Sequence, residues 1–230
     1  MGWNCKPSGP YNISDPDGTE NCQLYYQTLS QFTNDDNIVG QLCNVVAESG
    51  LNPWRWQGDV YGTGRGYGLF QFTPASGYLA LTSVPGYGPN LSTTQVSGGL
   101  PSDADAQLTV FINDLLSKWV STCWRSYWDP ATYPSLYAKR AAILATYGSG
   151  TSLSFNQFLA IDNTEDACFA FLACYEGPLV PNLTARLSNE EAIRNALALP
   201  PPGPTPGTDD DFLILMVETI LLKNRGRGNM

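Results

Sequence analysis

The chain has 230 residues, which is enough for one good hydrophobic core with at most a small additional segment. Its formal net charge is −9. This charge argues against a nucleic-acid-binding protein, which should present a basic face.

The sequence contains no histidine. This excludes Ser–His–Asp and Cys–His nucleophilic catalysis, zinc sites of the HExxH type and proton shuttles that use imidazole. Acid–base chemistry must therefore fall on Asp, Glu, Tyr, Lys or Cys. Cleavage of a glycoside, which needs one or two carboxylates, is the natural candidate, and no metal or other cofactor is expected.

The N-terminal third is predicted to contain an arm and two helices. Residues 1–19 are rich in Pro and Gly and should be irregular, and their start has no cationic or apolar segment that would indicate a secretory signal peptide. A first helix is predicted over residues 20–32. A second begins after the capping residue Asn34 and ends at Gly50, with Pro53 preventing its continuation.

The middle of the chain is predicted to alternate between loops and helices. Residues 54–99 are dense in Gly, Tyr and Thr and should form loops with at most a small hairpin. Further helices are predicted after a cap at Ser102 and over residues 133–147, 155–161, 165–174 and 188–199. The last of these begins at Ser188 with a sequence that fits a capping box. The predicted fold of residues 20–199 is a compact, mainly α domain with a small loop or β subregion lining a cleft.

The C-terminal segment differs in composition from the rest. Residues 200–208 read as a semi-rigid Pro-rich linker. Residues 209–230 contain an apolar stretch over residues 212–222 and a basic tail, and this stretch is too short to span a bilayer, which needs about 20 apolar residues. We expect residues 209–230 to bind other proteins of a larger particle, with attachment to a membrane surface as the alternative.

The six cysteines allow two interpretations. Cys5 and Cys22 flank a loop where a disulfide could form, and buried free thiols are the equally supported alternative. Cys168 and Cys174 should lie on different faces of one helix and should not pair with each other.

Glu48 is the candidate catalytic residue. It lies in the last turn of the second predicted helix, where the negative end of the helix dipole and burial among apolar neighbours both favour the protonated carboxyl group. Such a group can protonate a glycosidic oxygen. Aromatic residues that could stack on sugar rings follow it, namely Trp54, Trp56, Tyr61 and Tyr67. The alternatives are a solvated glutamate at a helix end and aromatic rings that belong to the core.

Three short motifs occur in order along the chain. They are Glu-Ser…Asn-Pro at residues 48–53, Gly-Tyr-Gly-Leu…Gln-Phe-Thr-Pro-Ala-Ser at residues 66–76, and Tyr-Glu-Gly-Pro at residues 175–178. The set resembles the phage tail lysozyme domain found at the tail tips of small podophages, over roughly residues 20–198. The chain is also similar to goose-type lysozymes and soluble lytic transglycosylases, although Glu176 replaces an asparagine of their third motif and one residue is missing before Gly177.

This resemblance implies an α+β lysozyme-like fold and cleavage of the β-1,4 bond between N-acetylmuramic acid and N-acetylglucosamine in bacterial peptidoglycan. The protein would be part of the virion, at the phage tail tip. A net charge of −9 gives no attraction to the anionic polymers of the cell wall. Such an enzyme would therefore need another component to bring it to the wall. Glu48 would be the general acid, and Tyr175 would orient it or stabilise the developing charge. Gln71 and the backbone from Gly68 to Phe70 would bind acetamido groups.

The resemblance does not decide the second carboxylate. Asp59 is the first candidate for positioning water, with a loop-capping role as its alternative. Glu176 is the second candidate and a possible substrate contact, with a structural salt bridge as its alternative. A lysozyme needs such a group, whereas a lytic transglycosylase lets the muramoyl 6-hydroxyl attack, so one carboxylate suffices. Analogy with the phage tail lysozymes favours hydrolysis. A function other than catalysis is also open: the protein could bind glycans or serve as a structural component of the tail.

Overall fold

The structure is a computed structural model that describes residues 2–6, 8–60, 62, 64–75, 102–122 and 129–201. The predicted segment 209–230 and nearly all of the predicted linker lie outside these residues. The helices are α1 (Pro16–Leu29), α2 (Asp35–Ser49), α4 (Ser102–Lys118), α5 (Pro134–Thr146), α6 (Phe155–Leu159), α7 (Thr164–Phe171), α8 (Leu183–Leu187) and α9 (Glu190–Leu197). A 3-10 turn, η1 (Gln57–Asp59), and a π-helical turn, η3 (Leu172–Glu176), complete the described elements.

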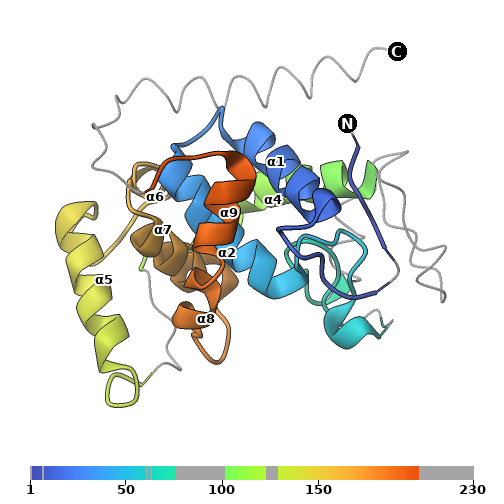
Figure 1. Cartoon of the computed structure of the whole chain (residues 1–230). Coiled ribbons are helices and arrows are strands. Elements are labelled where there is room, and N and C mark those ends of the chain that lie inside the picture. Colours follow the sequence, from blue (N-terminus) through green and yellow to red (C-terminus); the bar gives the residue numbers. More distant parts are fainter. Residues whose placement is uncertain are drawn as a thin grey trace, which may run out of the picture.

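The predicted mainly α fold class is confirmed (Figure 1). In the described part of the chain, β structure is limited to isolated antiparallel bridges. Two of these bridges, Trp56 with Tyr67 and Tyr67 with Phe72, lie in the loop region where a small hairpin was predicted. None of the helices that the structure describes combines the length and the apolar character needed to cross a bilayer.

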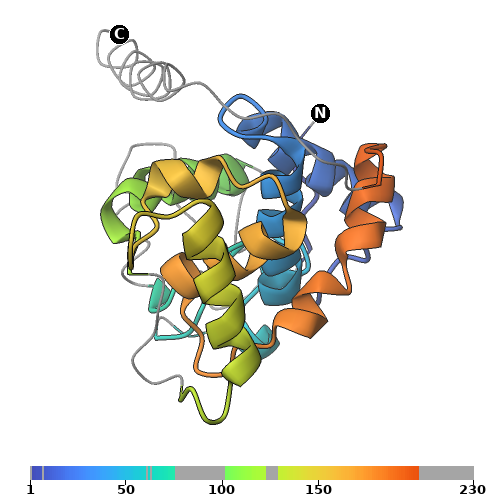
Figure 2. The same ribbon diagram turned by 90° about the vertical axis from the view of Figure 1, so that its left-hand side faces the viewer.

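Helix α2 forms the centre of the molecule (Figures 1 and 2). Its start and end are the predicted ones: the Asn34 side chain accepts a hydrogen bond from the backbone N–H of Asn37, and Gly50 ends the helix with a φ of 59°. Every residue from Asp36 to Val45 is buried, as expected for a helix that is covered on all sides. Gly40 allows α7 to pack closely, because a Cβ there would lie 2.7 Å from the backbone nitrogen of Cys168.

The first helix begins earlier than predicted. Pro16 occupies the first helical turn, where its missing N–H breaks no hydrogen bond, so the irregular arm ends at Asp15 and not at residue 19. The helix also ends at Leu29, three residues before the predicted end. The arm packs over the C-terminal end of α2, since Tyr11 donates a backbone hydrogen bond to the Gly50 carbonyl.

The later described helices lie in the predicted regions, but the last of them differs from the prediction. The predicted helix over residues 188–199 is instead divided between α8 and α9. The predicted capping box at Ser188 is not formed. The Ser188 hydroxyl donates to the Ala185 carbonyl, and α9 starts at Glu190 without a side-chain cap. The described capping box belongs to α6, where Ser154 and Gln157 satisfy each other's backbone N–H groups.

The disulfide that could have joined Cys5 and Cys22 is absent, because Cys22 is a free, fully buried thiol. Burial raises the pKa of this thiol to about 12. Cys43 of α2 and Cys168 of α7 are also buried free thiols, and the absence of a bond from Cys168 to Cys174 agrees with the prediction. The hydrogen bond with Cys168, and then burial, raise the pKa of Cys43 well above its usual value.

Candidate active site

A pocket of about 390 Å³ opens beside the C-terminal end of α2. It is bordered by the end of α2, the loop after it (cyan in Figure 1), the end of α4 and η3. Its lining consists of Glu48, Arg55, Gln57, Gly58, Phe70, Gln71, Phe72, Thr73, Lys118, Tyr175, Glu176 and Pro178. The pocket therefore brings together five of the predicted site residues, Glu48, Phe70, Gln71, Tyr175 and Glu176.

Glu48 is not surrounded by apolar groups as the sequence analysis expected. Its side chain is 24% exposed, and its Oε1 accepts a 2.6 Å hydrogen bond from Nη2 of Arg186 in α8. A guanidinium at this distance stabilises negative charge on the carboxylate, which opposes the effects of the helix dipole and of burial. Arg186 was not predicted as a site residue, because it lies 138 positions from Glu48 in the sequence and belongs to none of the three motifs.

Arg186 is itself held in place by α2. Its Nη1 donates to the backbone carbonyl and to the Oδ1 of Asn44, at 3.4 and 3.1 Å. The Asn44 amide nitrogen in turn donates to the carbonyls of Gly40 and Cys168, so its orientation is fixed by α2 and α7 together. Arg186 thus bridges two residues one turn apart on α2, and its own side chain is only 8% exposed.

Tyr175 and Glu176 enter the pocket from a π-helical turn. The N–H of Gly177 donates to the carbonyl of Leu172, five residues earlier, and Gly177 ends the turn with a φ of 56°. The Tyr175 ring packs edge-on against Phe111, with centroids 5.3 Å apart. Short π-helical segments often occur at functional sites. The sequence predicted an uninterrupted helix over residues 165–174, so this π-helical turn was not expected.

Glu176 lies near the core as well as lining the pocket. Burial first, and the charge of Glu176 second, raise the pKa of Tyr25 well above its usual value. Tyr25 is completely buried on α1 and donates its hydroxyl hydrogen bond to Gln41. The carboxylate of Glu176 therefore faces both the pocket and the interior of the helical domain.

The loop that carries Gln71 is braced by its own hydrogen bonds. Gln71 has a φ of 47°, and its side-chain nitrogen donates to the carbonyls of Arg55 and Gly68 at 3.1 and 2.9 Å. The backbone N–H of Gly68 donates to Arg55, and that of Leu69 donates to the Gln107 side chain. These two N–H groups are therefore engaged inside the protein, and the binding of acetamido groups by the rest of this backbone segment stays a prediction.

Gly68 and Phe70 shape the same loop. Gly68 has a φ of 81°, and a Cβ there would approach the Gln107 side-chain oxygen to 2.2 Å, so another residue would not fit. Phe70 is only 4% exposed, and its ring stacks on Phe111 with centroids 4.0 Å apart. Phe70 provides an apolar wall of the pocket, continuous with the core.

Two of the four aromatic residues that were predicted to stack on sugar rings are buried. Trp56 and Tyr67 are 2% and 1% exposed, and their rings pack against each other with centroids 4.5 Å apart. They belong to the core, which was the alternative interpretation. Trp54 is half-buried and is absent from the pocket lining, while Tyr61 lies outside the described residues.

Asp59 does not line the pocket. Its Oδ1 accepts a 2.8 Å hydrogen bond from the backbone N–H of Gly9, and it forms an ion pair with Arg55 at 3.7 Å. This geometry agrees with the loop-capping alternative. The cations that line the pocket, Arg55 and Lys118, were not predicted. Within the described ranges, no three His, Cys, Asp or Glu side chains lie close enough together to hold a metal ion.

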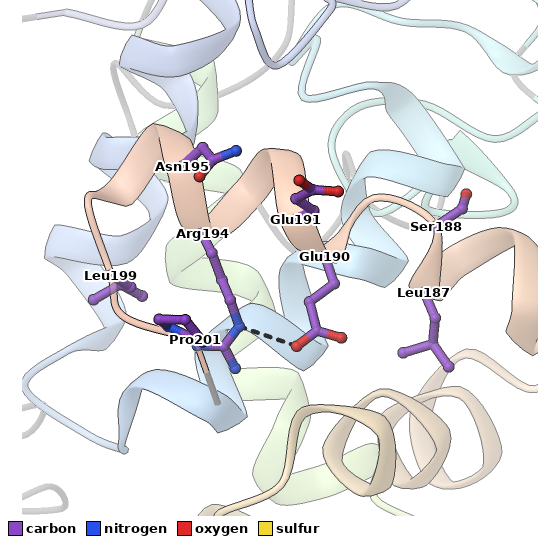
Figure 3. Close-up of a pocket in the computed structure, with 8 residues that line it drawn as sticks. All are labelled: Leu187, Ser188, Glu190, Glu191, Arg194, Asn195, Leu199 and Pro201. Carbon is purple, nitrogen blue, oxygen red and sulfur yellow. Dashed lines mark hydrogen bonds and ion pairs between the residues drawn. The ribbon is translucent and has the colours of Figure 1, made fainter. Parts of the chain in front are cut away.

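A larger pocket, of about 550 Å³, lies on α9 (Figure 3). Its central cation, Arg194, donates from Nε to Glu190 at 3.0 Å, and its Nη2 donates to Asp36 and to Thr164. Burial lowers the pKa of Arg194, but the hydrogen bonds and charges of Asp36 and Glu190 outweigh it, so the pKa is raised. The polar groups of this pocket serve the packing of α9 on α2, and none of the predicted site residues lines it.

Comparison with known protein families gives a match over most of the chain. The family model of the phage tail lysozyme matches residues 21–197, more than three quarters of the chain. The matched range contains every residue that lines the pocket beside Glu48. Membership indicates a lysozyme-like, peptidoglycan-degrading component of a phage tail. The chain belongs to the phage tail lysozyme family.

Proposed function

We propose that the protein cleaves the β-1,4 bond between N-acetylmuramic acid and N-acetylglucosamine, with Glu48 as the general acid. The observation that supports this most directly is the pocket itself. It gathers Glu48, Gln71 and Tyr175 from three separate segments, all inside the range that the family matches.

In the proposed reaction, Glu48 transfers its proton to the glycosidic oxygen. The bond from that oxygen to the anomeric carbon breaks, its electron pair passes to the oxygen, and an oxocarbenium-like centre develops on the sugar. Tyr175, at the pocket wall, orients Glu48 or stabilises this charge. Gln71 contributes the oxygen of its side-chain amide, since its nitrogen is bound to loop carbonyls.

Two nucleophiles can complete the reaction. In hydrolysis, water adds to the anomeric carbon and loses a proton to a second carboxylate. Glu176 is the better candidate for this role, because it lines the pocket and Asp59 does not. In transglycosylation, the 6-hydroxyl of the muramoyl residue adds instead and returns its proton to Glu48. Asp59 accepts a hydrogen bond from Gly9 and does not line the pocket, so one of the two candidates for the second carboxylate is not in place. This observation favours transglycosylation, which needs no second carboxylate.

Glu48→Gln tests the catalytic role. Gln retains the size of the side chain but has no acidic proton, so clearing of a peptidoglycan suspension should slow by about 10²- to 10⁴-fold. Thermal unfolding should show that the variant is folded, and Glu191→Gln, an exposed residue of α9, provides the matched control with unchanged activity. Unchanged clearing by Glu48→Gln would instead support a non-catalytic, glycan-binding tail protein.

Mass analysis of the released fragments distinguishes the two nucleophiles. Hydrolysis leaves a reducing end that borohydride reduces, whereas transglycosylation leaves an anhydro ring that is lighter by one water and resists reduction. We expect reducible ends, and we expect Glu176→Gln to slow their formation. Anhydro ends, with little effect of Glu176→Gln, would identify a lytic transglycosylase.

We also propose that the enzyme acts at the tail tip and is attached to other tail proteins through residues 209–230. The support is compositional: residues 212–222 are mostly apolar, they follow a Pro-rich segment, and basic residues come after them. Pull-down of purified tail proteins with the full chain, compared with a chain ending at residue 201, tests this attachment. Equal capture by both chains would contradict it.

A further inference from the structure

Helix α2 carries two carboxylates that are each paired with a buried arginine. Asp36, in the first turn, is bound by Arg194 of α9, and Glu48, in the last turn, is bound by Arg186 of α8. Both arginine side chains are 8% exposed. The Asp36 pair is enclosed between helices, whereas the Glu48 side chain lines the candidate active site.

The contact between Arg186 and Glu48 involves one oxygen of the carboxylate. Nη2 of Arg186 binds Oε1 of Glu48 at 2.6 Å, while Nη1 is anchored on Asn44. This anchoring fixes where Oε1 lies. Of the two oxygens of the carboxylate, Oε2 is the one that Arg186 leaves able to carry and donate a proton.

We propose that Arg186 is a positioning residue for Glu48, which holds Oε1 so that Oε2 delivers the proton and which stabilises the carboxylate left behind. This inference rests on the proposed function of Glu48. As the proton leaves, negative charge grows on Glu48 next to a fixed cation. That interaction is stronger in the transition state than in the protonated ground state, so it accelerates the reaction.

The other charged groups that line the pocket lie on other elements. They are Arg55 of the loop, Lys118 of α4 and Glu176 of η3. Substitution of Arg186 leaves these three groups in place, so a change in kcat reports on Arg186 itself.

Arg186→Met removes the charge and keeps much of the side-chain length. We expect kcat on peptidoglycan fragments to fall by about 10²-fold, with KM changed by a few-fold at most. Arg186→Lys, which keeps the charge but loses the anchoring on Asn44, should recover only part of kcat.

Arg194→Met is the matched control, since it removes the other buried arginine bound to α2. It should lower the melting temperature but leave kcat and KM unchanged when assayed well below that temperature. A merely structural role of Arg186 would make the two variants behave alike.

The outcomes separate the two proposals. If the wild-type protein cleaves peptidoglycan, Glu48→Gln does not, and Arg186→Met keeps the wild-type kcat, the positioning role is wrong and the proposed function stands. If Arg186→Met does not fold, a wild-type kcat in Arg186→Lys likewise overturns the positioning role. If the wild-type protein does not cleave, both are overturned.

Discussion

Glu48 is subject to two opposite influences that come from different helices. The C-terminal end of α2 and partial burial disfavour its charge, and Arg186 of α8 favours it. A general acid benefits from such a balance, because it must hold a proton before the reaction and release it during the reaction. The sequence has no histidine, so in the proposed reaction this role falls to a carboxylate.

The buried thiols should be chemically inert in the folded protein. The thiolate is the reactive form, and burial raises the pKa of Cys22 to about 12, so almost no thiolate is present at pH 8. We expect iodoacetamide to leave Cys22, Cys43 and Cys168 unmodified in the native protein and to modify all three in urea, as measured by peptide mass spectrometry. Rapid native alkylation of Cys22 would contradict this burial.

At the scale of single residues, the sequence was informative where a motif was local. Glu48, Gln71 and Tyr175 were predicted from short motifs, and they share one pocket. Arg186 was not predictable, because it is brought to Glu48 only by the packing of α8 against α2. Trp56 was misassigned because composition cannot distinguish a ring that stacks on a sugar from one that fills a core.

The π-helical turn η3 is the element that presents Tyr175 to the pocket. An α-helix that continued past Phe171 would rotate the later side chains relative to α7, so the wider turn determines which of them line the pocket. The turn depends on Gly177, whose φ of 56° is unfavourable for residues with a Cβ.

Gly177→Ala should therefore destabilise the protein and disturb the site together. We expect the free energy of unfolding in urea to fall by about 1 kcal/mol, and peptidoglycan cleavage to slow through the displacement of Tyr175. Gly64→Ala is the control, because a Cβ at Gly64 meets open space and its φ is ordinary. Equal stability of the two variants would show that the left-handed turn is not required.

Helices were predictable from the sequence because periodicity and capping are local properties. Asn34 and Gly50 gave both ends of α2 correctly. The switch from α7 to η3 carries no such signal, since the same apolar residues suit both geometries. The start of α1 at Pro16 was not predicted, because a proline usually indicates irregular structure. The first turn of a helix nevertheless accepts a proline.

At the scale of the whole molecule, the other helices pack around α2. The first and the last described helices, α1 and α9, also pack against each other. The mainly α class and the family were predictable, because the three motifs occur in order over one continuous range. The side-by-side placement of the first and last described helices was not predictable, because it depends on contacts between residues more than 150 positions apart, such as that of Gln23 with Ala196.

The folded protein should lose stability in alkali. Burial, as the largest cause, raises the pKa of Tyr11 and Tyr26 from 10.0 to about 12, and it raises the pKa of Tyr25 well above 10.0. Above pH 10 the unfolded chain has lost protons that the folded chain retains, so stability falls as the pH rises from 10 toward 12. We expect the urea midpoint to be lower at pH 11 than at pH 9. A midpoint that rises over this interval would contradict the burial of these tyrosines.

The distance along the chain between Glu48 and Arg186 also orders events during synthesis. A ribosome that has released residues 1–182 has produced Glu48, Gln71 and Tyr175, but not yet the arginine that orients the carboxylate. The last two helices of the described part of the chain, α8 and α9, supply both arginines that bind the ends of α2. Translation therefore separates the appearance of the acid from its alignment, and the site is completed only when the helical domain itself is complete.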